Sequence, residues 1–223
     1  MTHSGDPWTM SGMKDKNRPH EGPFREFLTG LVRDNAEHAR FMNMLSMLEH
    51  MGSRKIMVSQ MNRHETMDLD TLQHLSEEAR HAFFFKRQAQ RIGGQELIGW
   101  TDENTMHRVP AAMYFGRLDA GISKRVVGGD PSDPDNQAYP WVSLIIELRA
   151  CWIYHIYHEV LEVSDVKLSL KSLLAEEDKH LAEMFEMVGE NTALLQELCQ
   201  YETDLFTKFW NKIYPSQEIA QAA

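Results

Sequence analysis

Two short segments of the chain repeat one pattern of charged residues. They read LSEEARHA and LAEEDKHL, and each contains Glu-x-x-His: Glu78 with His81 in the first, Glu177 with His180 in the second. On a helix, at about 100° per residue, three steps place the two side chains about 60° apart and one turn along the axis. A carboxylate and an imidazole on one helix can then bind the same metal ion.

Each Glu-x-x-His pair also needs a carboxylate from the helix that forms a hairpin with its own. With the first turn centred at about residue 57, Glu78 faces Glu37, whereas Glu49 lies too near the turn. With the second turn centred at about residue 162, Glu177 faces Glu147. Glu147 stands inside an apolar run, where a desolvated carboxylate is costly unless it is paired or bound to metal.

The predicted ligand set therefore has four carboxylates and two imidazoles: Glu37, Glu78, His81, Glu147, Glu177 and His180. Four buried negative charges need compensation, which two divalent ions provide. Mixed carboxylate and imidazole ligands suit iron or manganese, so we expect two Fe ions, with Mn or a mixed Fe/Mn pair as open alternatives. The competing interpretation is a metal-free bundle whose Glu-Glu repeats are solvated helix faces.

The elements that must position these residues are helices, because apolar residues recur at steps of three and four and strand alternation is hard to find. The first two long helices pair as a hairpin, as do the next two. The connection between the pairs, about residues 94–138, is too long for a bundle loop and indicates a crossover. Long helices are predicted over residues 23–61, 68–91, 139–163, 165–188 and 191–214, with a shorter one over 110–126 in the crossover. Residues 23–214 would form one domain between flexible tails at 1–22 and 215–223.

Composition excludes several function classes. The chain has 33 Asp and Glu against 23 Lys and Arg, a net charge of −10 that argues against nucleic-acid binding. The two cysteines form no Cys-x-x-Cys pair, which fits a reducing compartment. The first 25 residues lack an apolar segment of signal-peptide length, and charged residues interrupt the most apolar stretch, 141–157. We therefore expect a cytoplasmic protein that binds no membrane.

In the order and spacing of these six ligands, residues 24–188 resemble the ferritin-like di-iron carboxylate superfamily. The resemblance implies an all-α, ferritin-like four-helix bundle with a long crossover between helices 2 and 3 and an extra C-terminal helix. One segment also resembles, locally, the cyanobacterial aldehyde-deformylating oxygenases. The residues of that segment are Glu147, Tyr154, His155, Tyr157, Val163, Ser164 and Asp165.

Several relatives fit the residues less well. Storage ferritins generally lack a histidine equivalent to His180, and rubrerythrins usually add a Cys-x-x-Cys iron site. The small subunit of ribonucleotide reductase has a radical tyrosine where this chain has Phe85. The resemblance then implies an O2-activating oxygenase or oxidase that acts on a small, largely apolar organic substrate. A metal-handling or peroxide-consuming protein without an organic substrate (a ferroxidase, or a rubrerythrin-like or Mn catalase-like enzyme) is the alternative.

Residues one or two turns from the predicted ligands are expected to line a substrate pocket: Phe41, Phe85, Cys151 and Tyr154. Each fits an ordinary helix core as well. His74 precedes Glu78 by four residues and shares its face, and we expect it to support a ligand by hydrogen bonding or to be exposed rather than to bind metal. No Gly-x-Gly-x-x-Gly follows a strand, so electrons would come from a separate ferredoxin or flavoprotein reductase. The sequence leaves open whether the chain forms a homodimer.

Overall fold

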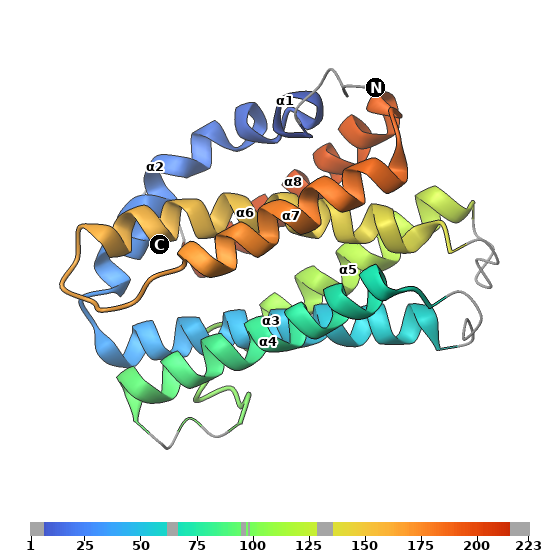
Figure 1. The fold of residues 1–223 in the computed structure, drawn as a ribbon. Helices are drawn as coiled ribbons and strands as arrows, with labels where there is room; N and C mark the ends of the chain where they lie inside the picture. The colour runs from blue at the N-terminus through green and yellow to red at the C-terminus, as the bar shows by residue number, and fades with distance from the viewer. Residues whose placement is uncertain (1–6, 62–66, 95–96, 98, 129–135, 215–223) are drawn as a thin grey trace.

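The computed structural model describes residues 7–61, 67–94, 97, 99–128 and 136–214, and these residues form α-helices and loops without any strand (Figure 1). The all-α prediction is therefore confirmed. In chain order the helices are α1 (Pro7–Ser11), α2 (Met13–Leu31), α3 (Asn35–Gln60), α4 (Leu69–Gly93), α5 (Arg108–Val127), α6 (Ala138–Glu162), α7 (Lys171–Val188) and α8 (Thr192–Ile213).

Two helical hairpins, α3 with α4 and α6 with α7, form the centre of the bundle (Figure 1). The hairpins meet where α3 contacts α6 and α4 contacts α7. The crossover between them carries α5, which packs against α3, α6 and α8. The paired helices and the crossover agree with the expectation from the sequence, although residues 129–135 of the crossover lie outside the described part.

The N-terminal region differs from the prediction. Residues 7–22, predicted as a flexible tail, form α1 and most of α2, and α2 contains both Pro19 and Pro23. Tertiary packing outweighs the helix-breaking tendency of proline here, because α2 packs against α6 and α8 and buries Met13, Asn17 and Phe24. The predicted C-terminal tail, residues 215–223, lies outside the described residues.

Helix boundaries also correct the sequence prediction in two places. The helix expected over residues 23–61 is interrupted at residues 32–34, where the Asp34 side chain accepts hydrogen bonds from the backbone N–H groups of Ala36 and Glu37 and caps α3. The helix expected from Asp165 begins instead at Lys171, after a non-helical connection. The first hairpin turn follows Gln60 and ends at Asp68, which caps α4.

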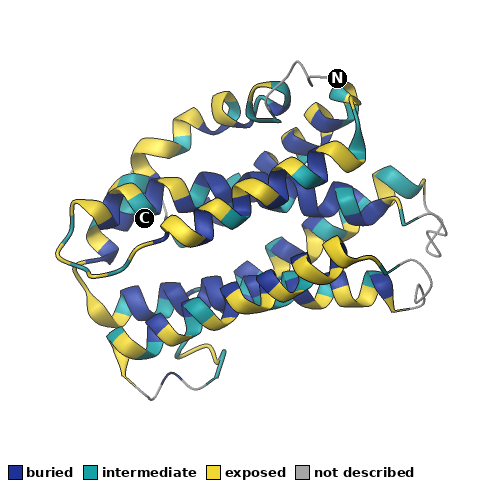
Figure 2. Cartoon of the chain, in the orientation of Figure 1, coloured by how far each residue is buried: buried dark blue, intermediate teal, exposed yellow. Residues whose placement is uncertain are grey.

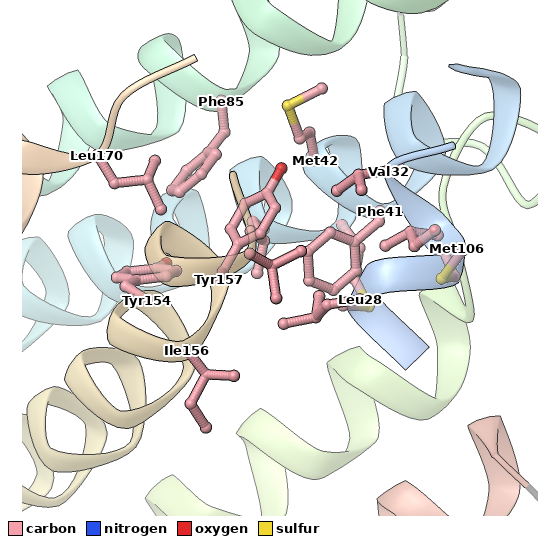
Figure 3. Close-up of a cluster of buried hydrophobic side chains, with 14 of the residues drawn as sticks. Leu28, Val32, Phe41, Met42, Phe85, Met106, Tyr154, Ile156, Tyr157 and Leu170 are labelled. Carbon is pink, nitrogen blue, oxygen red and sulfur yellow. The ribbon is translucent and has the colours of Figure 1, made fainter. Parts of the chain in front are cut away.

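Buried residues face the interior of the bundle along all four central helices (Figure 2). Part of this core is aromatic: Tyr154 and Tyr157 of α6 lie among Phe85 of α4 and Phe41 of α3 (Figure 3). No helix in the described ranges combines the length and the apolar character needed to cross a membrane.

Candidate metal centre

Seven buried acidic and histidine side chains meet in the middle of the bundle. They form two groups that share Glu78, and within each group one ligand atom from every residue lies within 4.8 Å of the others. One group is His74, Glu78, Glu147 and His180; the other is Glu49, Glu78, His81 and Glu177. Each of the four central helices thus supplies a carboxylate, and the shared Glu78 can bridge two ions.

Several polar atoms of these residues are arranged in a way that could hold metal ions. Oε1 of Glu78, Oε1 of Glu177, Nδ1 of His81 and Nδ1 of His180 are buried without a hydrogen-bond partner. Nδ1 of His81 lies 3.0 Å from Oε1 of Glu177, and Nδ1 of His180 lies 3.4 Å from Oε1 of Glu78. Buried polar atoms normally have a hydrogen-bond partner. Four buried nitrogen and oxygen atoms that lack one and face one another therefore suit the binding of divalent ions.

The other ring nitrogens of two of the histidines are held by carboxylates in a crosswise arrangement. Nε2 of His180 on α7 lies 2.7 Å from Oε2 of Glu77 on α4, and Nε2 of His81 on α4 lies 2.8 Å from Oε2 of Glu176 on α7. A carboxylate accepts and does not donate, so each Nε2 carries the proton and each Nδ1 is free for a metal. The first Glu of each Glu-Glu pair therefore orients the histidine of the opposite repeat. Arg80 lies 2.6 Å from Glu176 and 3.7 Å from Glu77.

His74 belongs to the cluster itself. Its Nδ1 lies 2.9 Å from the Tyr139 hydroxyl, and its Nε2 lies 3.2 Å from Oε1 of Glu147 and 3.6 Å from Oε1 of Glu78. The side chain is buried. In this position Nε2 could bind the same ion as Glu147 and His180, so the structure places His74 among the candidate ligands, whereas the sequence favoured a supporting or exposed role.

The four carboxylates of the centre differ in proton affinity. Burial, with the nearby charges of Glu78 and Glu177, raises the pKa of Glu49 and that of Glu147 well above the ordinary value for glutamate. Burial also acts to raise the pKa values of Glu78 and Glu177, but close contacts with the neighbouring imidazoles lower both. Glu49 and Glu147 thus hold a proton more tightly than Glu78 and Glu177 do.

The histidines respond to the same charges in the opposite sense. Burial acts to lower the pKa of His81, but its contacts with Glu177 raise it to about 10. Contacts with Glu177 and Glu78 likewise raise the pKa of His180 to about 10 against the effect of burial. Both imidazoles are protonated at neutral pH in the absence of metal, and these protons must leave before Nδ1 can bind an ion.

Glu37 is the one predicted ligand that the structure does not bring to the cluster. Its side chain is 43% exposed and pairs with Arg40 at 2.7 Å, within the first turn of α3. Glu49 takes the expected place on this helix. The sequence prediction paired residues at equal distances from a turn centred at about residue 57. Because α3 continues to Gln60, the turn lies several residues later, and Glu78 faces a later part of α3. The other five predicted ligands lie in the two groups.

A small apolar cavity of about 70 Å³ adjoins the cluster between α3, α5 and α6. Its walls include Glu49, Glu78 and Glu147 from both ligand groups, with Leu118 and Ile153 among the apolar residues. The crossover helix α5 contributes Tyr114, Phe115 and Leu118 to the lining of the cavity. The cavity is thus a mainly apolar space that reaches the candidate ligands.

Of the four residues predicted to line a substrate pocket, only Tyr154 borders this cavity. Its hydroxyl donates a hydrogen bond to Oε1 of Glu49. Phe85 packs against the Tyr154 ring with centroids 5.4 Å apart, and Phe41 packs against Tyr157 (Figure 3). Cys151 is buried in a separate part of the core, 4.0 Å from Oδ1 of Asp178. These three residues thus belong to the packed interior rather than to the cavity wall.

Comparison of the chain with family models, with curated proteins and with solved structures finds no match. The sequence and structure therefore support an all-helical protein with buried Glu and His groups that are able to hold metal ions.

Proposed function

We propose that this protein is a di-iron oxidoreductase that activates O2 and acts on a small, largely apolar organic molecule. The observation that carries the proposal is the apolar cavity, which adjoins both candidate ligand groups rather than one. The ligand pattern resembles that of the ferritin-like di-iron carboxylate superfamily and supports the choice of iron over zinc or calcium.

A pair of iron ions held by these residues would supply the redox chemistry, and the protein would supply binding and orientation. Glu49, His81 and Glu177 would hold one ion; His74, Glu147 and His180 would hold the other, with Glu78 shared by both. The outer carboxylates fix the two histidines that bind through Nδ1. The Tyr154 hydroxyl fixes one oxygen of Glu49 and leaves the second for metal.

The apolar side chains beside the cluster would position the substrate and exclude bulk water. Leu45 and Ile153 face the cavity from α3 and α6, and Phe115 and Leu118 face it from α5. Excluding water strengthens the electrostatic interactions within the site and limits side reactions. Electrons for a net reductive reaction would come from a separate ferredoxin or flavoprotein reductase.

A storage or iron-oxidising role is the alternative that the experiment must separate from this one. The purified protein would be loaded anaerobically with two equivalents of Fe(II) and exposed to O2 with and without small apolar candidate substrates. The proposal predicts O2 consumption that depends on substrate and an oxidised organic product. Continued oxidation of added Fe(II), with a growing ferric core and no substrate dependence, would refute it.

A matched variant links the result to the cavity. Leu118→Trp would fill the space from α5 without altering a ligand, and is expected to keep the two ions while abolishing substrate-dependent O2 consumption. If Leu118→Trp retains its metal content and also retains full substrate-dependent turnover, the cavity is not the substrate site.

A further inference from the structure

The cavity has a polar end that metal binding does not use. Its α6 wall is centred on Ile146, Ala150 and Ile153. Counting about 100° per residue, Glu147 and Arg149 project about 160° apart and flank this wall on opposite sides. Both residues border the cavity. A molecule that lies across the wall therefore has Glu147 of the candidate metal centre on one side and Arg149 on the other.

Arg149 is held rigidly in the core. Its Nε lies 2.7 Å from Oε1 of Glu202, and its Nη2 lies 2.6 Å from Oε2 of Glu202 and 2.8 Å from Oδ1 of Asn17. The guanidinium Cζ lies 3.8 Å from the centroid of the Phe206 ring. Only 4% of the Arg149 side chain is exposed. This bidentate pair neutralises the Arg149 charge and fixes the direction of the remaining N–H groups.

One nitrogen of this guanidinium has no acceptor. Nη1 of Arg149 is buried and makes no hydrogen bond to any residue that the structure describes. Tyr114 stands next to it: its hydroxyl donates to Oε1 of Glu202 at 2.6 Å, and its side chain borders the cavity. A buried N–H donor without an acceptor is unfavourable, so an oxygen atom placed at this end of the cavity would gain a hydrogen bond that the protein alone does not make.

We propose that the cavity binds a small neutral molecule with an apolar body and one acceptor oxygen, a carbonyl or an ether, which accepts a hydrogen bond from Nη1 of Arg149. The inference rests on the proposed function in naming this molecule as the substrate class. Neutrality follows from the charges: Glu202 already compensates Arg149, and Glu49, Glu78 and Glu147 disfavour an anion at the other end. At about 70 Å³ the cavity has about half the volume of one that holds benzene, which limits the enclosed part to about three non-hydrogen atoms, enough for the carbonyl or ether oxygen and the carbon atoms bonded to it.

The test uses two probes of the same shape, butanone and 2-methyl-1-butene, which differ by exchange of a carbonyl oxygen for a methylene group. Binding would be followed from the methyl resonances of Ile146 and Ile153 in the full-length protein, both metal-free and loaded with redox-inactive Zn2+. We expect about tenfold tighter binding of butanone. Equal affinity for the two probes, binding of neither, or tighter binding of butyrate than of butanone would overturn the proposal.

A double variant assigns the preference to Arg149. Arg149→Met alone leaves Glu202 buried and unpaired and is expected to unfold the protein, so it is combined with Glu202→Gln, which still accepts from Tyr114. In this background the preference for butanone should fall to less than twofold while 2-methyl-1-butene still binds. A preference that persists there would assign the donor to another residue and overturn the role of Arg149.

Failure of this inference and failure of the proposed function give different results. Probe binding is measured without iron or turnover, so an enzyme that oxidises a substrate but shows no carbonyl preference refutes only the role of Arg149. A carbonyl preference without substrate-dependent O2 consumption would retain the binding site and refute the oxygenase assignment.

Discussion

The crosswise carboxylates Glu77 and Glu176 should control metal affinity although neither belongs to the two ligand groups. Each lies within 2.8 Å of the Nε2 of a histidine whose Nδ1 faces the centre. Removing a hydrogen-bond partner of this kind typically weakens metal affinity by roughly 10- to 100-fold. Glu77→Gln keeps an acceptor oxygen but removes the charge, so we expect about tenfold weaker binding; Glu77→Ala removes both and should cost about 100-fold.

The two positions should differ in size of effect. The Glu77 side chain is 11% exposed, whereas the Glu176 side chain is 26% exposed and also pairs with Arg80 at 2.6 Å. Solvent and Arg80 both weaken the influence of Glu176 on its histidine, so Glu176→Gln should have the smaller effect.

Competition with a chromophoric chelator for Co2+ or Zn2+ measures these affinities directly. Glu186→Gln on the exposed face of α7 is the control, because it removes one negative charge from the helix that carries His180, the partner of Glu77, at a residue for which the structure gives no contact with a histidine. If Glu77→Gln and Glu186→Gln bind metal equally tightly, the crosswise hydrogen bonds do not orient the ligands.

Three further predictions follow from the same structure. Glu49→Ala should lose the ion bound by the Glu49 group, whereas Glu37→Ala should keep both; equal metal content in the two variants would contradict the placement of Glu49. Metal binding at neutral pH should release protons from His81 and His180, because the pKa of each is about 10 without metal. Affinity should therefore rise with pH up to about 10, and calorimetry in buffers of different ionisation enthalpy would detect an absence of release. Finally, a Cβ on Gly93 would lie 2.5 Å from Cβ of Ala39, whereas one on Gly116 would meet nothing. Gly93→Ala should lower the free energy of unfolding by about 1–3 kcal/mol and Gly116→Ala should raise it by about 0.5–1 kcal/mol, as measured by urea denaturation; the opposite order would refute the close packing of α3 and α4.

The helical fold, the pairing of the central helices and five of the candidate ligands could be predicted from apolar periodicity and from the repeated motif. Both repeated Glu-Glu-x-x-His segments were predicted to face the interior of the bundle, and both lie in the core. Glu147 was predicted to join them because a charged residue inside an apolar run is costly unless it is paired or bound to metal, and it lies in the same cluster. Helix type and pairing followed from apolar spacing. Apolar spacing does not give the exact centre of a turn. The sequence prediction centred the first turn at about residue 57, but α3 continues to Gln60, and this shift led to the choice of Glu37 instead of Glu49.

The residues that the sequence prediction undervalued are those whose role depends on a neighbour from a distant segment. His74 shares a face with Glu78, but only the approach of Tyr139 and Glu147 from α6 shows that its Nε2 points to the centre. The first Glu of each repeat was visible as part of the shared pattern. Its partner is the histidine of the other repeat, and a single helix cannot show that contact. Likewise, α2 forms despite two prolines because of packing against α6 and α8.

The candidate centre contains histidines whose orientation is fixed by hydrogen bonds and carboxylates that can change their mode of binding. The cavity borders the carboxylates. His81 and His180 are each held by an outer carboxylate, and His74 by the Tyr139 hydroxyl. Among the residues the structure describes, no histidine borders the cavity; the ligands that do are all carboxylates, one terminal glutamate from each group and the shared Glu78. A carboxylate can bind through one oxygen or two, whereas a pinned imidazole has one mode. A molecule in the cavity would therefore meet the candidate ligands that can rearrange, while the histidines would hold the ions in place.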